Sequence, residues 1–447
     1  MPDQHLRWWE WRGHARNGRH PGAAHAPNLA IRAGAPMNAQ DALFSQLRVV
    51  EVGSFVAGPA AATILGDLGA EVLKIEQPGQ GDLWRHQYRR PELPQASTNY
   101  LWLLTGRGKQ SVAIDLKTAE GRQLLHRICT QADVFITNLP VPARTGLGVD
   151  YQTLAALNAR LVYASFTGYG EQGDEKDEAG FDTTGWWARS GLMDQSRSDP
   201  EAPPAKAPAA SGDHLSALSI FGAIVSALYR RERTGLGGYV GSSLLANGAW
   251  QNAVYIQAAL AGAEFRPIRK RSENWNPLNI HYLCSDDRWF MITINPAHQA
   301  LHWSAFAAVV ECPDLLTDSR FNTYDARLKH SVELIRRLDD AFVRRTADDW
   351  KQRFKGTGIV TSVVARAQDA PNDEQMKANG ILVDLEGVPG VPTTVASPFF
   401  IHGENKRVAT RAPDVGEHTT AVLKQLGLSA EDITRLQDAG IVQSRDR

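Results

Sequence analysis

One aspartate has the chemistry and the surroundings of a nucleophile. Asp182 ends the segment AGFD at 179–182, follows a predicted strand and precedes the aromatic pair Trp186 and Trp187. A carboxylate that is partly removed from water can attack an activated carbonyl group and hold the acyl group covalently. An aspartate at this point is also a common helix N-cap, so the residue taken alone leaves both roles open.

Two histidines are candidate general bases. His214 lies in the segment GDH at 212–214, and His418 lies in GEHT at 416–419. Both stand at expected helix starts, where capping and packing are the commoner reasons for such residues. No His/Cys cluster has the spacing of metal ligands, and no G-x-S-x-G nucleophile elbow occurs. We therefore expect no bound metal.

Basic residues gather near the ends of the first predicted strands. Arg85 follows the turn GQGD at 79–82, and Arg107 and Lys109 precede the strand that begins at Ser111. Cationic side chains on loops at one edge of a sheet can hold phosphate groups. A solvated basic face would contain the same residues, so the sequence alone does not choose between the two.

The turn GSFVAG at 53–58 joins a strand to a helix, which is where a dinucleotide-binding fold holds a pyrophosphate. Glu76 ends the next strand, where a ribose-binding acid would lie. The glycine triad G-x-G-x-x-G is absent, and so is the GK[ST] of a P-loop. This favours a plain tight turn and argues against a hydride-transfer dehydrogenase. We expect Pro59 at the first position of the following helix.

The elements that would carry these residues alternate along the chain. Apolar β-rich runs predict strands, and capped amphipathic segments predict helices between them. Strands are expected at 47–52, 70–76, 111–116, 132–137 and 161–166, with helices at 60–68, after Thr118 and at 151–157. Such alternation predicts an α/β fold with a parallel, doubly wound sheet and right-handed crossovers.

The regular alternation stops after residue 166. The later segments are expected to be a long helix, a strand or buried helix start, a β-hairpin, a helical region and two short helices, at 215–231, 238–245, 281–294, 332–354 and 416–441. The hairpin turn falls at Asp286 and Asp287. The hairpin and the helices after it predict a smaller α+β region.

Composition excludes several classes of function. The chain has 447 residues, with 48 Lys and Arg against 49 Asp and Glu and a formal net charge of -1. Nucleic-acid binding needs a clustered cationic excess, and a membrane helix needs ~20 apolar residues in a row, so we expect neither partner. Three widely spaced cysteines fit no disulfide framework, which indicates a reducing compartment and hence a cytoplasmic location. The first 36 residues lack signal-peptide features and are expected to be a disordered or mis-started extension.

From about Leu47 onward, ordered stretches of the sequence resemble class III CoA-transferases. This is the CaiB/BaiF family, which also contains carnitine CoA-transferase, formyl-CoA transferase and the α-methylacyl-CoA racemases. The matching stretches are VAGPAAATILGDLGAEVLKIEQPGQGD (56–82), GKQSVAIDLKTAEG (108–121), ADVFITN (132–138), GLGVDYQTLAALNARLVYASFTGYG (146–170), AGFD (179–182), GDH (212–214) and APDVGEHTTAVLKQLGL (412–428).

The resemblance implies a fold and an assembly. It implies a Rossmann-like large domain, a second, smaller α+β domain, and two chains threaded through each other as an interlocked homodimer. The expected parts are an N-terminal extension, the large domain, a linker, the small domain and a return to the large domain, at 1–44, 45–235, 236–280, 281–380 and 381–447.

The resemblance also implies the chemistry. Asp182 falls on the family's nucleophile, which forms a mixed anhydride with the acyl group of an acyl-CoA and then an aspartyl-CoA thioester that passes CoA to a small carboxylic acid. Coenzyme A is thus a co-substrate, and no metal takes part. The resemblance places the CoA contacts on six residues: Val56, Ala57, Arg85, Arg107, Lys109 and, more weakly, Arg144.

The sequence departs from the family pattern at three places. Thr105 or Gly106 stands where the family commonly has an asparagine before the basic pair Arg107 and Lys109. Val56 stands where the family often has a polar residue, and the segment RSENWNPLN at 271–279 replaces the glycine-rich lid of the oxalate-type enzymes. We therefore do not expect oxalate or formate as the acid.

Two alternative functions remain open. A racemase of the same superfamily needs two acid–base groups that face each other across the substrate, typically a histidine with the aspartate. No histidine lies between His126 and His214, which disfavours this alternative. A non-catalytic CoA-binding protein would have no need of a reactive Asp182.

Overall fold

The computed structural model describes residues 42–445. Of the extension expected over 1–44, residues 1–41 lie outside the described range. Residues 42–44 are already packed, because the Phe44 amide donates to the Leu68 carbonyl oxygen at 2.9 Å and the Phe44 ring contacts Phe221.

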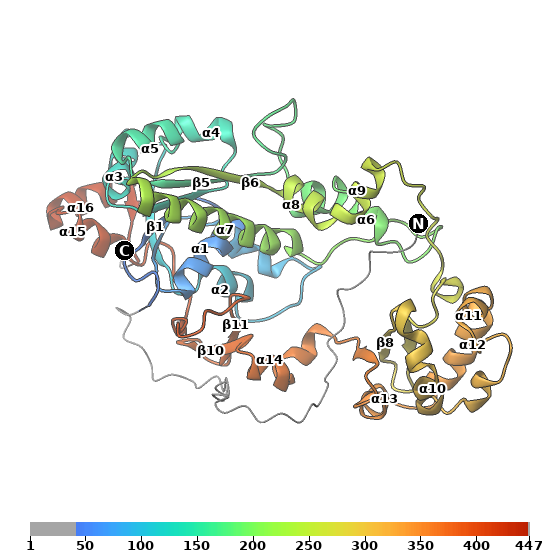
Figure 1. Cartoon of the computed structure of the whole chain (residues 1–447). Helices are drawn as coiled ribbons and strands as arrows, with labels where there is room; N and C mark the ends of the chain where they lie inside the picture. The colour runs from blue at the N-terminus through green and yellow to red at the C-terminus, as the bar shows by residue number, and fades with distance from the viewer. Residues whose placement is uncertain (1–41, 446–447) are drawn as a thin grey trace, which may run out of the picture. The chain divides into compact units, whose positions relative to one another are not determined.

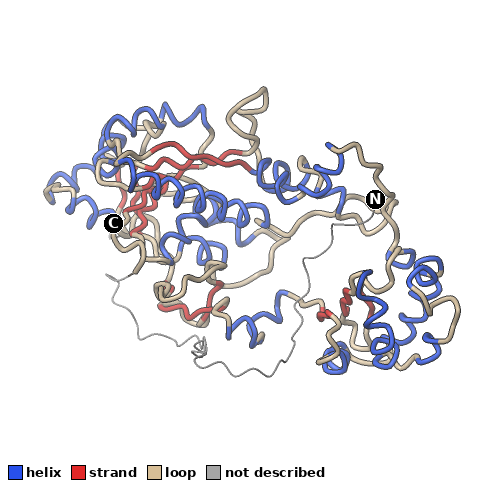
Figure 2. The backbone as a smooth tube through the Cα atoms, viewed as in Figure 1, coloured by secondary structure: helices blue, strands red, loops and turns tan. Residues whose placement is uncertain are grey.

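A seven-stranded sheet organises the larger part of the described chain (Figures 1 and 2). Its strand order is β13-β3-β2-β1-β4-β5-β6, and all neighbouring strands are parallel except β13 and β3. The strands are β1 (Arg48–Glu51), β2 (Glu71–Glu76), β3 (Gln110–Ile114), β4 (Val134–Thr137), β5 (Val162–Thr167), β6 (Gly238–Ser243) and β13 (Val442–Gln443). The predicted α/β fold with a parallel central sheet is confirmed.

Helices cover both faces of this sheet, which is why its inner strands are apolar runs with few exposed residues. One core cluster joins α1 and α7 to one face, and a second joins α3, α5, α15 and α16 to the other. The helices of this part are α1 (Ala57–Asp67), α2 (Tyr100–Gly106), α3 (Ala119–Cys129), α4 (Val141–Gly146), α5 (Tyr151–Leu157), α6 (Leu192–Gln195), α7 (Ser211–Thr234), α15 (Thr419–Gln425) and α16 (Ala430–Asp438). Thr118 and Asp150 cap α3 and α5 as predicted.

The longest helix, α7, runs beside α1 (Figure 1) and ends at Gly235, which adopts φ 73°. By length and composition alone α7 could also span a membrane, which differs from the expectation that no segment is apolar enough. Its inner face packs into the core cluster of the sheet, and Arg231 pairs with Asp133 at 2.9 Å. These contacts explain the apolar residues on the inner face of α7.

The region 236–280, expected to be a linker, carries regular structure. It begins with β6, which pairs in parallel with β5 from Val162 to Thr167, so the central sheet continues past residue 235. Two helices follow, α8 (Leu244–Gln251) and α9 (Ala253–Leu260).

A three-stranded antiparallel sheet, β7-β8-β9, organises the smaller α+β region and includes the predicted hairpin. Its core cluster is drawn entirely from residues 278–359. The elements are β7 (His281–Leu283), β8 (Trp289–Thr293), α10 (Gln299–Val309), α11 (Tyr324–Lys329), α12 (Ser331–Phe342), α13 (Ala347–Phe354) and β9 (Val360–Val363).

The C-terminal part contains a small sheet that the sequence pattern did not predict. Its order is β11-β10-β12, with α14 (Glu374–Ala378), β10 (Leu382–Glu386), β11 (Thr393–Val395) and β12 (Ala409–Thr410). The chain then adds α15 and α16, the two short helices predicted around Gly427, to the core of the large sheet. Strand β13 closes the edge of that sheet by pairing with Ala113 and Ile114 of β3.

Candidate active site

The central sheet reverses its strand order between β1 and β4. At such a point the loops after the two strands diverge and leave a crevice at the carboxyl ends, where open α/β sheets bind their ligands. Here the turn after β1 is tied to Asn138, the residue after β4. Asn138 accepts from the Ser54 amide at 2.9 Å and donates to the Ser54 carbonyl oxygen at 2.7 Å.

The turn after β1 holds a strained residue. Phe55 has φ 63°, a left-handed conformation that a bulky residue adopts only when its surroundings impose it. Asp82 imposes it, because one carboxylate oxygen accepts from the Phe55 amide at 3.0 Å and from the Ser54 hydroxyl at 2.6 Å. The geometry of the turn is therefore set before α1 begins.

Helix α1 begins directly after this turn. Val56 is its N-cap and Ala57 its first residue, so Pro59 stands at the third helical position and not at the predicted first. The Val56 and Ala57 side chains are buried in the core, and the N-cap makes no side-chain hydrogen bond. Uncapped amides at a helix start can stabilise negative charge.

Asp182 reaches the same edge of the sheet through a close contact between two backbone segments. The chain leaves β5, makes an acidic excursion and returns so that Gly180 lies against Gly168, where a Cβ atom on Gly168 would come within 2.8 Å of the Gly180 Cα atom. The Phe181 ring then meets the Phe55 ring edge to face, with centroids 5.7 Å apart. This contact places Asp182 beside the turn that starts α1.

Asp182 is the first residue of a short π-helix, η3 (Asp182–Ala188), and its side chain is half-buried. Its carboxylate accepts from the Thr183 hydroxyl at 3.3 Å and forms no ion pair within residues 42–445. It is not the side-chain cap of η3, because Phe181 occupies the N-cap position. The helix-capping explanation for Asp182 is therefore wrong.

Two residues at the start of α7 interact electrostatically with Asp182. Burial, together with the negative charge of Asp182, raises the pKa of Asp213 to about 7. Desolvation by the surrounding protein atoms and the positive charge of Arg107 lower the pKa of His214, whereas the charge of Asp182 acts to raise it. The GDH segment at 212–214 suggested only His214 as a functional group, whereas Asp213 also interacts with Asp182.

Arg85 and Arg107, two of the predicted phosphate contacts, already have carboxylate partners. Arg85 donates two hydrogen bonds to Glu76, at 2.8 and 2.7 Å, and stacks on Trp102 with its guanidinium carbon 3.7 Å from the ring centroid. Arg107 pairs with Asp67 at 2.9 Å. Glu76, considered above as a ribose-binding acid, is thereby occupied by a protein cation.

Lys109 and Arg144 are buried as well. Lys109 pairs with Glu51 at 2.6 Å and donates to the Pro59 carbonyl oxygen at 2.7 Å. Arg144 donates to the Ser165 hydroxyl at 2.7 Å. The contacts of these four cations with CoA thus stay a prediction. Each cation would have to contact CoA while it keeps its present partner in the protein.

A buried ionic network lies beneath the turn, and the sequence analysis missed it. Lys74 contacts Glu51 at 2.6 Å and Asp82 at 2.8 Å, and the side chains of Lys74, Glu51 and Asp82 are fully buried. Burial opposes the charge of Lys74, but Asp82 and Glu51 outweigh it and raise its pKa. Burial lowers the pKa of Lys109 to about 8 against the attraction of Glu51. The available signal was the presence of Glu51 and Lys74 inside otherwise apolar strands, because buried charges are almost always paired.

His418 has a structural contact. Its Nδ1 atom accepts from the Ser111 amide at 3.3 Å, and its own amide donates to the Ser111 carbonyl oxygen at 2.9 Å. These bonds attach the C-terminal segment to β3. Among residues 42–445, no group of three His, Cys, Asp or Glu side chains has the arrangement of a metal site.

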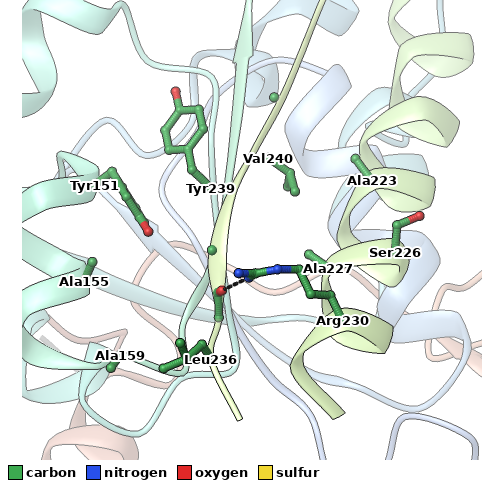
Figure 3. A pocket seen from close by; sticks show the side chains of 13 residues that line it. Tyr151, Ala155, Ala159, Ala223, Ser226, Ala227, Arg230, Leu236, Tyr239 and Val240 are labelled. Carbon is green, nitrogen blue, oxygen red and sulfur yellow. Dashed lines mark hydrogen bonds between the residues drawn. The ribbon is translucent and has the colours of Figure 1, made fainter. Parts of the chain in front are cut away.

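A pocket of about 880 Å³ lies along the edge strand β6, between α5 and α7 (Figure 3). Tyr151, Tyr239 and Arg230 line it together with small residues, and Arg230 donates to the Gly237 carbonyl oxygen at 2.7 Å. Asp182 does not line it. This pocket and Asp182 therefore lie in different places.

Known proteins are similar to this chain over most of its length. The model of CoA-transferase family III matches residues 44–419. The (R)-2-hydroxy-4-methylpentanoate CoA-transferase of Clostridioides difficile is 32% identical over 90% of this chain and 100% of its own length. The cinnamoyl-CoA:phenyllactate CoA-transferase of Clostridium sporogenes is 31% identical over 88% of this chain and 96% of its own.

A solved structure agrees. A CAIB/BAIF family protein from Brucella suis superposes with a TM-score of 0.74 at 29% identity, covering 85% of this chain and 98% of its own. Because the family model spans most of the chain and relatives above 30% identity cover nearly all of it, the chain belongs to CoA-transferase family III and is a CoA-transferase.

Proposed function

We propose that this enzyme moves CoA from an acyl-CoA donor to a free carboxylic acid, with Asp182 as the covalent carrier. The observation that carries the proposal is the position of Asp182. It is half-buried, lies beside Phe55 and the start of α1 at the carboxyl edge of the sheet, and has no ion-pair partner among residues 42–445. A carboxylate in such a place remains accessible to a bound thioester.

The transfer divides one difficult exchange into acyl transfers of similar energy. The Asp182 carboxylate attacks the thioester carbonyl, the carbon–sulfur bond breaks, and a mixed anhydride and CoA thiolate form. The thiolate attacks the Asp182 carbonyl, which releases the donor acid and leaves an aspartyl-CoA thioester. The acceptor carboxylate then attacks this thioester, and the returning thiolate forms the new acyl-CoA and frees Asp182. We assign stabilisation of the oxyanions to the amides at Val56 and Ala57.

We assign part of the CoA phosphate binding to Arg85. A pocket of about 450 Å³ is lined by Arg85, His86, Tyr88, Arg89 and Asn99. Arg89 would add positive charge beside Arg85, whose bond to Glu76 holds its guanidinium in place. Phosphate oxygens are well matched to such a cationic surface.

We propose a carboxylic acid with an apolar side chain as one substrate. Phe181 is 57% exposed and contacts Phe55 next to Asp182, which is a surface suited to apolar groups. Two relatives are named for acids of this kind, 2-hydroxy-4-methylpentanoate and phenyllactate. Other relatives are named for succinate and glutarate, so a panel of acids must include dicarboxylates.

The remaining expectations concern assembly and location. The order of β3, β2, β1, β4, β5 and β6 supports the Rossmann-like description of the large domain. Trp250, Val254 and Leu260 on α8 and α9 are 83%, 79% and 77% exposed, an apolar surface that supports a homodimer. The three cysteines are buried and unpaired, which supports a reducing, cytoplasmic location.

The racemase alternative also needs a test, because His214 and Asp182 interact electrostatically. A racemase would exchange the α-proton of its acyl-CoA with solvent. Incubation with acyl-CoA in deuterium oxide, followed by mass spectrometry of the acyl group, distinguishes the two reactions. Deuterium at the α-carbon without CoA transfer would favour the racemase.

The direct test uses hydroxylamine. Wild-type enzyme incubated with acyl-CoA should yield a hydroxamate at Asp182 alone, detected by peptide mass spectrometry. Asp182→Asn should abolish exchange and retain acyl-CoA binding. Exchange at the wild-type rate in Asp182→Asn would reject the assignment.

A further inference from the structure

The last part of the chain reaches the arginine to which a phosphate contact was assigned. Arg85 lies in a short 3-10 helix after β2, η2 (Leu83–Arg89), and its Nη1 atom donates to the Pro413 carbonyl oxygen at 2.9 Å. The same oxygen accepts from the indole N–H of Trp102 at 3.0 Å, and this ring is the one on which Arg85 stacks. Arg85 and Pro413 are 328 positions apart in the sequence. One carbonyl oxygen thus ties the C-terminal segment to the arginine and to its stacking partner.

A glycine lets these distant segments meet. Gly81 has φ 65°, and a Cβ atom on it would come within 2.6 Å of the Val415 side chain. The same atom would lie 3.0 Å from Arg85 and 3.0 Å from Glu76. Any larger residue at position 81 would push these groups apart. The segment 413–416 is therefore part of the wall behind the Arg85 side chain.

Ser111 joins that segment to the carboxylate that holds Arg85. The Ser111 side chain is fully buried, and its hydroxyl donates to Oε2 of Glu76 at 2.6 Å. The same hydroxyl accepts from the Gly416 amide at 2.9 Å, which a hydroxyl can do because it has one donor and two acceptor lone pairs. Glu76 in turn accepts from Nε and Nη2 of Arg85. The position of the guanidinium therefore depends on Ser111 through Glu76.

Glu76 is held in its charged form. Burial acts to raise the pKa of Glu76, but the hydrogen bonds from Arg85 and the charge of Lys74 outweigh burial, with help from Ser111, and lower it. A carboxylate makes short and directional paired bonds with a guanidinium. The Glu76 carboxylate therefore fixes the plane of the Arg85 guanidinium as well as its place.

Arg85 keeps two N–H groups for a ligand. A guanidinium has five N–H donors, and within residues 42–445 Arg85 uses three of them, two for Glu76 and one for Pro413. Arg85 also lines the pocket of about 450 Å³ described above, together with Arg89 and Asn99. A group that is already held in place loses little freedom when it binds an anion, so its support contributes to affinity.

We propose that Ser111 and the segment Pro413–Gly416 position Arg85 for contact with a phosphate group of the CoA nucleotide. This rests on the phosphate role proposed for Arg85. Ser111 touches neither substrate nor the reacting atoms, and it acts through Glu76. Its contribution is therefore to the affinity for CoA thioesters and not to the transfer steps at Asp182.

Replacing Ser111 with alanine tests the proposal. The change leaves the Gly416 amide without its acceptor and Glu76 without one donor, so the guanidinium loses part of its support. Steady-state rates are measured with acyl-CoA and with acyl-pantetheine, which lacks the nucleotide phosphates. Ser111→Ala should raise the KM for acyl-CoA by ~10-fold and leave kcat and the KM for acyl-pantetheine unchanged, the effect of a lost hydrogen bond to a charged group.

The matched control loosens the same segment without touching the support of Arg85. The Thr419 hydroxyl accepts from the Ala113 amide at 3.0 Å, two residues beyond Ser111 on β3, and Thr419 is also fully buried. Thr419→Val should lower the thermal unfolding temperature and keep the wild-type ratio of the two KM values. The same change of ratio in Thr419→Val as in Ser111→Ala would show a general loosening and would overturn the role of Ser111.

A second variant addresses the Pro413 carbonyl oxygen and does not depend on the folding of Ser111→Ala. Trp102→Phe keeps a ring beneath Arg85 and removes the N–H that holds Pro413. It should raise the KM for acyl-CoA by ~3-fold and leave that for acyl-pantetheine unchanged. A wild-type ratio of KM values in both Ser111→Ala and Trp102→Phe would reject the positioning role.

Arg85→Ala separates this proposal from the one on which it rests. Arg85→Ala should raise the KM for acyl-CoA selectively, and adding Ser111→Ala to it should change the ratio no further, because Ser111 acts through Arg85. Equal effects of Arg85→Ala on both donors would reject the phosphate contact itself. A selective effect of Arg85→Ala with a further, additive effect of Ser111→Ala would leave that contact standing and reject the positioning role alone.

Discussion

Replacing Asp82 with asparagine removes one of the two carboxylates that neutralise Lys74 in the fully buried network below the turn after β1. Asparagine has nearly the same shape and keeps one oxygen for the Ser54 hydroxyl and the Phe55 amide. The change therefore tests charge more than packing. Lys74 would be left with Glu51, which it shares with Lys109.

The size of the effect follows from this sharing. Breaking a buried ion pair on one side costs about 3–5 kcal/mol, and the remaining contact of Lys74 with Glu51 at 2.6 Å places the estimate near the lower figure. With a urea dependence of about 3 kcal/mol per M, a loss of ~3 kcal/mol lowers the unfolding midpoint by roughly 1 M. The turn at Phe55 should also relax, and exchange should slow.

Urea unfolding followed by circular dichroism measures this change. The matched control is Asp314→Asn, which breaks an exposed pair with Arg337 and should cost about 0–1 kcal/mol. The pKa of Asp82 is held below its usual value because Lys74 outweighs the effect of burial. Its stabilisation is therefore present above the unfolded pKa and lost as pH falls through the folded one, and Asp82→Asn should be less sensitive to acid. A midpoint equal to that of Asp314→Asn would refute the importance of the network.

Two further substitutions test the site. Arg107→Ala should weaken acyl-CoA binding by about 10- to 100-fold, the value of a charged hydrogen bond, and should weaken the binding of acyl-pantetheine, which lacks the nucleotide phosphates, far less. Arg231→Ala removes a similarly buried pair with Asp133 and should leave the ratio of the two affinities unchanged. Equal losses of affinity for both ligands in Arg107→Ala would argue against a phosphate contact. Gly212→Ala places a Cβ atom within 2.6 Å of Trp186 and should lower the free energy of unfolding by about 1–3 kcal/mol and slow CoA exchange. Gly222→Ala, in the same helix with nothing within 4 Å, should be neutral or stabilising by up to about 1 kcal/mol. Equal effects of the two substitutions in thermal unfolding would show that the contact of Gly212 with Trp186 is unimportant.

The regular part of the fold was predictable because local patterns and tertiary contacts agree there. Strands β1 to β5 are apolar runs of four to six residues between helices with recognisable caps, such as Thr118. The segment 238–245 left a strand and a buried helix start open, and it lay in the expected linker, because the glycines and exposed residues of β6 give a weak pattern. Strands β12 and β13 have two residues each, too few for any periodicity.

The site was predictable in part. The resemblance predicts Asp182 as the nucleophile, but the surroundings of Asp182 depend on contacts between distant segments that no local pattern records. The contact of Gly168 with Gly180 and the left-handed Phe55 exist only in the folded chain. The raised pKa of Asp213 comes from burial and from Asp182, a neighbour 31 positions earlier in the sequence, so no local pattern shows it. The partners of Arg85 and Arg107, Glu76 and Asp67, are likewise invisible as pairs in the sequence.

The pairing of β13 with β3 bears on how the chain folds during synthesis. Residues 113 and 114 leave the ribosome more than three hundred residues before residues 442 and 443, their partners at the sheet edge. Until then one edge of the nascent sheet is uncovered and open to pairing with another chain. The intervening α+β region has a core of its own, so it can form while the larger sheet still waits for its last strand.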